Sequence, residues 1–430
     1  MALKAVKGKT LVVKNFSCIE KASFKINDLT LIIGPQASGK SVLCKLFYFF
    51  HSIPDELPRW VQDVSKGGDL KGRILERFSE WFPPSSWGGR QFSITYSTGE
   101  FSLSITKSRS RDPKAKLVGS KNYEDLFNKL VGIYKSSRES KAARENAEVD
   151  NGWRLYTVLD RTIESLMGDE KPLGQLFIPA GRSFFTSVGK IVAAFEAGGI
   201  LDPVVSRFGR LVTQLREHAF FEGEPKNKNL SIIEGLIGGH VIRERGREFL
   251  STPDGRSIPF SALSSGQQEL LPLFDGLRFS QFSEQNNLIY IEEPEAHLFP
   301  SAQTELVGMF AQLINSGKRK VVPRSKNKIL ANRQIVLTTH SPYVLAKINN
   351  LIKAGDLGSR VTGEKKKALE KVVDPSCWIS PRSVSAYKIV DGKLSSIIDE
   401  YGLIDGDYID SVSATTGIEF DALIDIEVSL

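Results

Sequence analysis

No apolar run in this 430-residue sequence reaches the roughly 18–20 residues that a membrane-spanning helix needs. The first ten residues lack the basic start, the long apolar stretch and the small-residue cleavage site of a signal peptide. Cysteine is scarce, and Cys18, Cys44 and Cys377 show neither metal-ligand spacing nor the pattern of a disulfide framework. We therefore expect a cytoplasmic protein without a membrane partner.

Basic side chains are absent from residues 394–430, which contain nine acidic residues. The rest of the chain has 57 basic and 41 acidic residues, a net charge of +16. Segments 107–116 and 318–328 concentrate lysine and arginine, and we expect them to be exposed loops. This distribution predicts contact with an anionic partner, either nucleic acid or an acidic protein. The alternative is a solvated surface whose charge is balanced by the tail of the same chain.

A long coiled coil is also missing, because no heptad repeat continues for the necessary three or four heptads or so. Residues 122–167 have helical spacing with a polar middle, which predicts a short helical insertion. Alternating apolar residues predict a hairpin over 92–105 with its turn at Gly99. Two further strand pairs are predicted, one flanking residues 253–255 and an accessory pair around residues 391–392.

A glycine-rich loop follows the apolar run 29–33, which predicts a buried strand. Residues 34–41 match the pattern G-x-x-x-x-G-K-[ST] and precede a segment with helical spacing, as a phosphate-binding loop requires. The backbone N–H groups of such a loop and the helix N-terminus bind phosphate oxygens. We expect Lys40 to reach the β- and γ-phosphates and the Ser41 hydroxyl to bind Mg²⁺. The predicted nucleotide contacts are Gly34, Pro35, Gln36, Ala37, Ser38, Gly39, Lys40, Ser41 and Val42.

Two adjacent carboxylates follow the apolar run 288–291. Transfer of a phosphoryl group to water needs a metal ion and a positioned base. We therefore assign Glu292 to the metal, through water, and Glu293 to the base. Without the phosphate-binding loop, an acidic pair after a strand would be equally compatible with a solvated strand end.

A small-residue loop at 263–267 precedes a helical pattern and is a second candidate anion site. His340 follows the predicted strand 334–338. The phosphate loop, this Leu-Ser-Ser-Gly-Gln loop, the acidic strand and the Thr-Thr-His-Ser motif occur in the order found in one family. In this respect the chain resembles the ABC-type ATPase heads of SMC, RecF and OLD-like proteins, over about residues 1–345.

The resemblance implies that two copies bind ATP and Mg²⁺ between the phosphate loop of one and the signature loop of the other. Ser265 and Gly266 would contact the γ-phosphate bound to the other copy. Residues 295–297 match the dimer-contact loop of the family, and His340 matches the histidine that senses the γ-phosphate. A homodimer of heads, or a higher homo-oligomer, is therefore expected. The expected contacts of the signature loop are Ser264, Ser265, Gly266 and Gln267.

Two positions depart from the family pattern. Most relatives have Asp where Glu292 stands, so the longer side chain changes the metal geometry. The family also has a Mg²⁺-binding glutamine at the strand that joins its two lobes. The matching stretch 177–183 contains none, and Gln175 precedes the predicted strand 176–178. Arg182 would instead reach phosphate or the facing subunit, and its alternative is a surface ion pair.

These observations predict an α/β protein, a P-loop NTPase with a mixed central sheet, an antiparallel β subdomain and a helical insertion. The expected segments are a first ATPase lobe at 1–110, the insertion at 111–176, a lobe-connecting and lid segment at 177–260, a second lobe at 261–345 and an accessory segment at 346–430.

The short insertion argues against an SMC protein. A head of this size resembles the ATPase subunits of bacterial anti-phage systems, such as the PARIS and Septu ATPases, in which the ATPase acts with a separate effector. By this analogy we expect a regulatory ATPase with an effector protein as partner and with nucleic acid or an acidic phage protein as a further partner. The alternative is a DNA-repair or DNA-maintenance ATPase of the RecF type.

Overall fold

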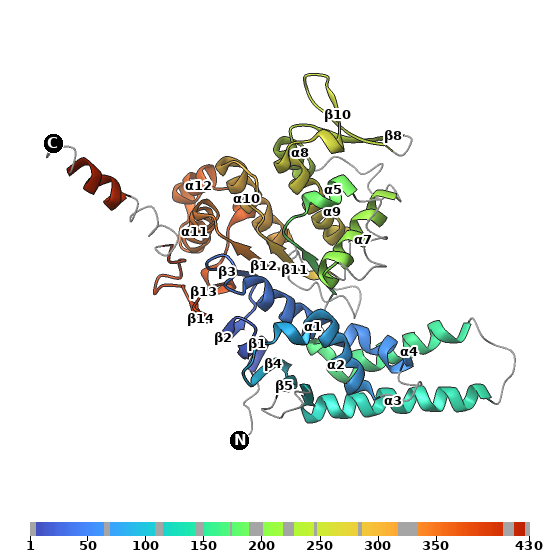
Figure 1. The fold of residues 1–430 in the computed structure, drawn as a ribbon. Coiled ribbons are helices and arrows are strands. Elements are labelled where there is room, and N and C mark those ends of the chain that lie inside the picture. Colours follow the sequence, from blue (N-terminus) through green and yellow to red (C-terminus); the bar gives the residue numbers. More distant parts are fainter. Residues whose placement is uncertain are drawn as a thin grey trace. The chain divides into compact units, whose positions relative to one another are not determined.

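Helices combine with an antiparallel and a parallel set of strands, so the predicted α/β class is confirmed (Figure 1). The computed structural model describes residues 6–63, 69–107, 115–142, 150–172, 174–188, 201–217, 228–244, 247–282, 286–316, 333–406 and 417–425. The contacts between residues divide the chain into two units. The first contains Met1–Ile26, Gln36–Gln175 and Ile389–Ser395, and the second contains Asn27–Pro35, Leu176–Lys388 and Ser396–Leu430.

The first unit contains an antiparallel sheet with the strand order β6-β5-β4-β1-β2. The predicted hairpin is confirmed as β4 and β5, because Thr98 pairs with Phe101 across Gly99, whose φ is 52°. β14 pairs with β2 in parallel, through Lys393 and Lys21. These strands are β1 (Val6–Phe16), β2 (Ile19–Lys25), β4 (Phe92–Gly99), β5 (Phe101–Lys107), β6 (Ala115–Gly119) and β14 (Lys393–Ser396).

The helices of the first unit pack on one another and on this sheet. Aromatic rings fill the space beneath them, and Phe16 contacts Phe78, Phe82 and Phe92 at centroid distances of 5.8, 5.8 and 5.0 Å. The predicted helical insertion is present as two contacting helices, α3 and α4. The helices are α1 (Lys40–Asp63), α2 (Leu70–Trp81), η2 (Pro84–Ser86), α3 (Lys121–Ala142), α4 (Asp150–Met167) and η3 (Gly168–Glu170).

The second unit is built on strands in the order β13-β3-β12-β11-β7. β3 pairs in parallel with both β12 and β13, and β11 pairs in parallel with β12. All five residues of β3 are buried, as expected for a parallel strand covered on both faces. The strands are β3 (Leu29–Ile33), β7 (Gly174–Ile178), β11 (Asn286–Glu292), β12 (Gln334–Thr339) and β13 (Val384–Val390).

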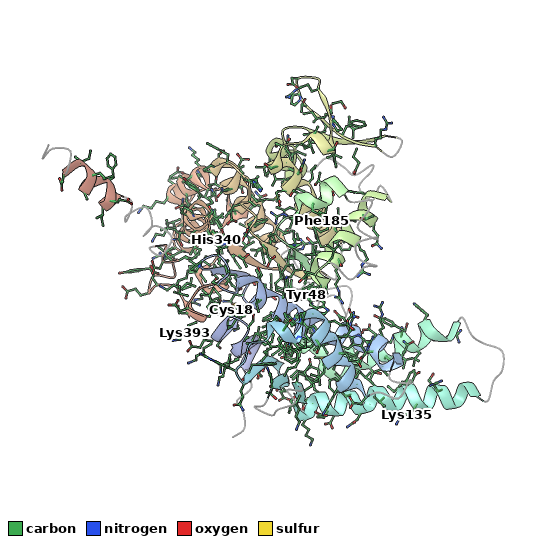
Figure 2. All side chains as sticks on the ribbon, viewed as in Figure 1. Cys18, Tyr48, Lys135, Phe185, His340 and Lys393 are labelled. Carbon is green, nitrogen blue, oxygen red and sulfur yellow. The ribbon has the colours of Figure 1, made fainter. Side chains whose placement is uncertain are left out.

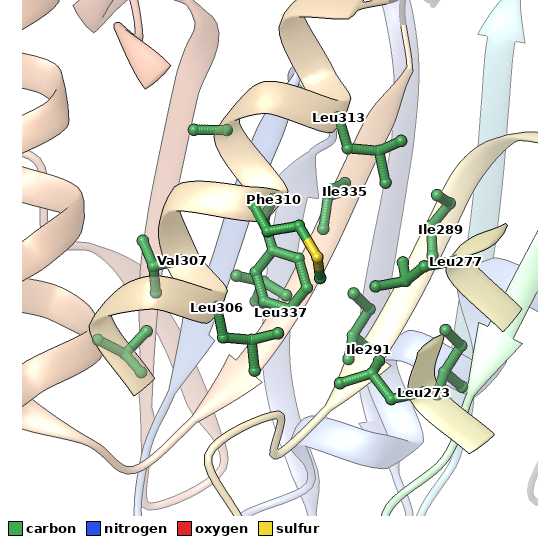
Figure 3. Close-up of a cluster of buried hydrophobic side chains, with 14 of the residues drawn as sticks. Leu273, Leu277, Ile289, Ile291, Leu306, Val307, Phe310, Leu313, Ile335 and Leu337 are labelled. Carbon is green, nitrogen blue, oxygen red and sulfur yellow. The ribbon is translucent and has the colours of Figure 1, made fainter. Parts of the chain in front are cut away.

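Helices α9 and α10 pack against β11 and β12 and close the core of the second unit (Figure 3). The α-helices are α5 (Ser183–Val188), α7 (Pro203–Glu217), α8 (Lys228–Ile237), α9 (Ser265–Phe282), α10 (Pro300–Ser316), α11 (Pro342–Gly358) and α12 (Gly363–Val372). Single 3-10 turns are η5 (Phe260–Ala262), η6 (Pro375–Cys377) and η7 (Pro381–Ser383). The core side chains in Figure 3 include Leu273, Leu277, Ile289, Ile291, Leu306, Val307, Phe310, Leu313, Ile335 and Leu337.

A smaller antiparallel sheet also belongs to the second unit. Its order is β10-β9-β8, formed by β8 (His240–Glu244), β9 (Arg247–Ser251) and β10 (Ser257–Pro259). The strand pair predicted around residues 253–255 is therefore confirmed as β9 and β10, and β8 extends it.

The strand pair predicted around residues 391–392 is confirmed as β13 and β14, which are hydrogen-bonded neighbours in the sheet, and β13 also pairs in parallel with β3 from Val384 to Lys388. One smaller prediction is wrong. Gln175 lies inside β7 and does not precede it, and its Nε2 donates to the Tyr48 carbonyl at 2.8 Å. The predicted basic segments lie largely outside the described residues, 318–328 entirely and 107–116 from 108 to 114. Among the helices that the structure describes, none is long and apolar enough to cross a bilayer.

Candidate functional site

The phosphate-binding loop occupies the six residues between the end of β3 at Ile33 and the start of α1 at Lys40. Its backbone turns through positive φ values at Ala37 (60°) and Gly39 (104°). The φ of Gly39 is one that residues with a Cβ rarely adopt, so this position favours glycine. Lys40 is buried with 6% of its surface exposed, at the N-terminal end of α1. The local geometry is therefore that of a loop whose backbone can wrap an anion.

The acidic turn begins at Glu292, the last residue of β11, whose side chain is 5% exposed. Its Oε2 accepts a hydrogen bond from the Ala180 backbone N–H at 3.3 Å. Its Oε1 is buried and has no hydrogen-bond partner among the described residues. A buried carboxylate oxygen without a donor is costly unless a cation balances it. Glu292 therefore fits the metal-holding role that its place in the sequence predicted.

Glu293 follows with a positive φ of 43°, which is strained for a residue with a Cβ. Its backbone N–H donates to the Thr338 carbonyl of β12 at 3.0 Å. The side chain is 41% exposed, and Oε1 lies 3.3 Å from Nε2 of His340. The turn thus directs one carboxylate, Glu292, into the protein and the next, Glu293, toward solvent beside a histidine.

His340 lies between the end of β12 and the start of α11 (Figure 2). Its backbone N–H donates to Glu295 Oε1 at 2.7 Å, and the same oxygen accepts from the Thr339 hydroxyl at 2.7 Å. Ser341 caps α11 by accepting from the Val344 N–H at 3.2 Å. Glu295, which the resemblance assigned to a dimer-contact loop, is thus used within the chain to fix the backbone that carries His340.

The signature loop begins α9 with a capping box. The Ser264 hydroxyl accepts from the Gln267 N–H at 3.4 Å, and Gln267 Oε1 accepts from the Ser264 N–H at 3.0 Å. Gln267 also donates through Nε2 to the Ile237 carbonyl at 2.8 Å. The side chains of Ser264 and Gln267 are therefore engaged in holding the loop, while Ser265 is exposed at the first position of the helix.

Gly266 packs directly against the turn after the acidic pair. A Cβ at this position would lie 2.8 Å from the His297 carbonyl oxygen, a backbone atom that cannot move by a rotamer change. The signature loop and the 293–297 turn therefore contact each other, and the contact needs a residue without a side chain.

The substitution Gly266→Ala should lower the rate of ATP hydrolysis by about tenfold, because small displacements of catalytic groups are costly. Helix propensity opposes this effect, since alanine favours a helix by about 1 kcal/mol over glycine. Gly308→Ala in α10 is the matched control, because the nearest atom to its added Cβ is Cys377 Sγ at 4.0 Å. Steady-state hydrolysis and thermal unfolding of both variants test this. Equal rates in the two variants would show that the contact has no role in the reaction.

Arg182 corrects a prediction. We expected its side chain to reach phosphate, a facing subunit or a surface acid, but it is 0% exposed. Its guanidinium donates to the carbonyls of Glu292, Glu293 and Pro179 at 2.6, 3.1 and 3.0 Å. The remaining nitrogen, Nε, lies 3.3 Å from Glu269 Oε2. These hydrogen bonds lie inside the second unit, and they hold the acidic turn.

The second unit thus brings together Arg182, the signature loop, Glu292, Glu293, Glu295 and His340, whereas Lys40 and Ser41 belong to the first unit. Sequence reasoning did not identify Glu269, which is 2% exposed and pairs with Arg182. The sequence did contain one indication, since Glu269 stands directly before the apolar stretch of α9. A carboxylate that is buried with such a stretch is rare unless it is paired, so a basic partner could have been sought.

Residues 185–345 match the model of the AAA ATPase domain family, a range that contains the signature loop, the acidic turn and His340 but not the phosphate loop. The search of curated proteins gave no match.

Among solved structures, the chain is similar to the SMC head domain from Thermotoga maritima, with 13% identity, a TM-score of 0.36 and coverage of 91% of this chain and 98% of that one. It is also similar to an SMC head bound to the C-winged helix domain of ScpA, with 12% identity, a TM-score of 0.41 and coverage of 91% and 98%. A third is the SMC head domain with an extended coiled coil from Pyrococcus furiosus, with 12% identity, a TM-score of 0.35 and coverage of 90% and 95%. The family match supports an ATPase domain over residues 185–345, the part of the chain that carries the signature loop, the acidic turn and His340.

Proposed function

We propose that this chain binds and hydrolyses ATP, and that its sites are completed between two copies of the chain. The observation that carries the proposal is the acidic turn. A buried Glu292 with an unsatisfied oxygen and an outward Glu293 lying 3.3 Å from His340 are arranged as a metal holder and a base require. The turn of the phosphate-binding loop through positive φ at Ala37 and Gly39 also supports the proposal.

Each residue has a role that its surroundings support. Lys40 offsets phosphate charge at the start of α1, where the helix dipole adds to its effect. The Ser41 hydroxyl and the Glu292 carboxylate each offer an oxygen that suits Mg²⁺, and this ion would supply positive charge to offset that of the phosphates. Glu293 orients the attacking water and accepts its proton, and His340 fixes the Glu293 carboxylate from the side.

The second copy is proposed because the signature serine, Ser265, is exposed and its side chain forms no hydrogen bond within the part of the chain that the structure describes. Ser265 opens α9 beside the 293–297 turn, and the helix N-terminus there is an anion site. Two aromatic side chains close in sequence to the acidic turn and His340 are also exposed, Phe299 at 77% and Tyr343 at 50%. Such apolar surface supports contact with another protein, and the resemblance to ATPase heads makes a second copy the expected one.

A mixing experiment tests the shared site. Ser265→Arg places a long cation where the partner's γ-phosphate would approach, so hydrolysis should stop while each chain still binds ATP. Lys40→Ala should be inactive through loss of binding. A heterodimer of the two has one site with both lesions and one site with neither, so mixing two inactive variants should restore part of the activity. Full activity of Ser265→Arg alone would show that each chain acts by itself.

The finer proposal is a regulatory role, in which the ATPase controls a separate effector in an anti-phage system in the bacterial cytoplasm. It rests on the motif resemblance and on the short helical insertion of α3 and α4. An effector should then co-purify with the chain, and nucleic acid or an acidic phage protein would be the trigger. The second candidate, a RecF-type DNA ATPase, is favoured by the basic charge of residues 1–393. Hydrolysis that is stimulated by DNA and falls steeply with salt would select it.

A further inference from the structure

Arg182 is the largest side chain that is completely buried in the described part of the chain. It follows β7 through Pro179, Ala180 and Gly181, whose positive φ of 67° lets the backbone turn sharply. Burial lowers the pKa of Arg182, and the nearby carboxylates, Glu269 foremost, act in the opposite direction. Arginine nevertheless stays protonated in proteins, so this is a buried cation that must be balanced.

Arg182 holds the peptide groups of both acidic residues. Nη1 donates to the Glu292 carbonyl at 2.6 Å and Nη2 to the Glu293 carbonyl at 3.1 Å. The Glu293 N–H is held separately, by the Thr338 carbonyl at 3.0 Å. The strained backbone of Glu293 is therefore fixed on both sides, which sets the direction in which its carboxylate leaves the turn.

The other end of this network is the signature helix. Glu269 Oε2 accepts from the Arg182 N–H and Oε1 from the Ser183 N–H, each at 3.2 Å. Arg182 Nε in turn donates to the Glu269 carbonyl at 3.3 Å. Glu269 lies one turn into α9 from Ser265, so the guanidinium joins the first turns of the signature helix to the acidic turn.

We propose that Arg182 is a positioning residue that couples the signature helix to the base, so that a displacement of α9 changes the orientation of Glu293. This inference rests on the proposed ATPase function and adds a route by which contact at Ser265 controls hydrolysis. The planar guanidinium suits this role, because its fixed fork reaches two neighbouring carbonyls and a carboxylate at once. A lysine would keep the charge but could not hold all three.

The test compares two arginines that are paired with the same helix. Arg182→Lys should lower kcat by about 100-fold with little change in the KM for ATP, because the base is misplaced while nucleotide contacts remain. Arg216→Lys is the matched control. The side chain of Arg216 is only 9% exposed and lies 3.5 Å from Asp275 of α9, and its other hydrogen bond goes to the Phe185 carbonyl and not to Glu292 or Glu293. Both variants should unfold at a lower temperature, whereas only Arg182→Lys should lose kcat.

A second variant separates coupling from folding. Glu269→Gln leaves the acidic turn untouched and keeps an oxygen for one of the two backbone N–H groups. This variant should nevertheless lower kcat. In the double variant with Arg182→Lys, the fold-loss of kcat should be smaller than the product of the two single fold-losses, because both substitutions act through one contact.

The outcomes distinguish this inference from the function on which it rests. Wild-type protein without ATP hydrolysis would overturn both. Active wild-type protein in which Arg182→Lys loses no more kcat than Arg216→Lys would overturn the coupling alone. So would a parallel loss of ATP binding in Arg182→Lys, or independent effects of Arg182→Lys and Glu269→Gln.

Discussion

Lys40→Ala is expected to abolish ATP binding. Lys40 is the only lysine in the phosphate-binding pattern and is buried at the start of α1, where no other side chain of the pattern carries positive charge. Removing it leaves the charge of the β- and γ-phosphates without its main cationic partner in a poorly solvated site. Titration with a fluorescent ATP analogue measures the effect.

Lys71→Ala is the control for this prediction. Lys71 belongs to the same unit and pairs with Glu124 at 2.8 Å, but its side chain is 40% exposed on α2. Exposed ion pairs contribute little to stability, so this variant should bind ATP as the wild type does. Wild-type affinity in Lys40→Ala would refute the assignment of the phosphate-binding loop.

Glu293→Gln should bind ATP normally and hydrolyse it about 10²–10⁴-fold more slowly, as expected when a positioned base is lost. The amide preserves the size of the side chain and its place beside His340 but cannot accept the proton from water. ATP should then remain bound and hold two copies together. Single-turnover hydrolysis measures the rate, and size-exclusion chromatography with ATP measures the assembly.

Glu305→Gln on the exposed face of α10 is the control and should change neither the rate nor the assembly. Normal hydrolysis by Glu293→Gln would move the base to another acid, with Glu292 and Glu295 the next to test. Slow hydrolysis without ATP-dependent assembly would support the role of Glu293 but contradict the dimer proposal.

Local patterns were sufficient for much of the fold and for the candidate residues. The loop after β3, the hairpin of β4 and β5 and the acidic end of β11 each depend on residues that are close in the sequence, at most 15 positions apart in the hairpin. Glycine spacing, alternation and apolar runs report such short-range geometry directly. The motif order then indicated which of these segments belong to one site.

Contacts between distant segments were beyond the reach of these patterns. Arg182 and Glu269 are separated by 87 positions. Arg182 was expected at phosphate, at a facing subunit or in a surface ion pair, and Glu269 was not identified. Both side chains are buried in the folded chain, and a guanidinium without solvent is stable only where a carboxylate and carbonyl groups surround it. The two residues therefore pair with each other. The membership of β13 in the parallel sheet has the same origin, since hydrogen bonding with β3 depends on a strand more than 350 positions away. Composition and spacing thus identified the chemical groups, and long-range packing decided which of them are buried and which are exposed.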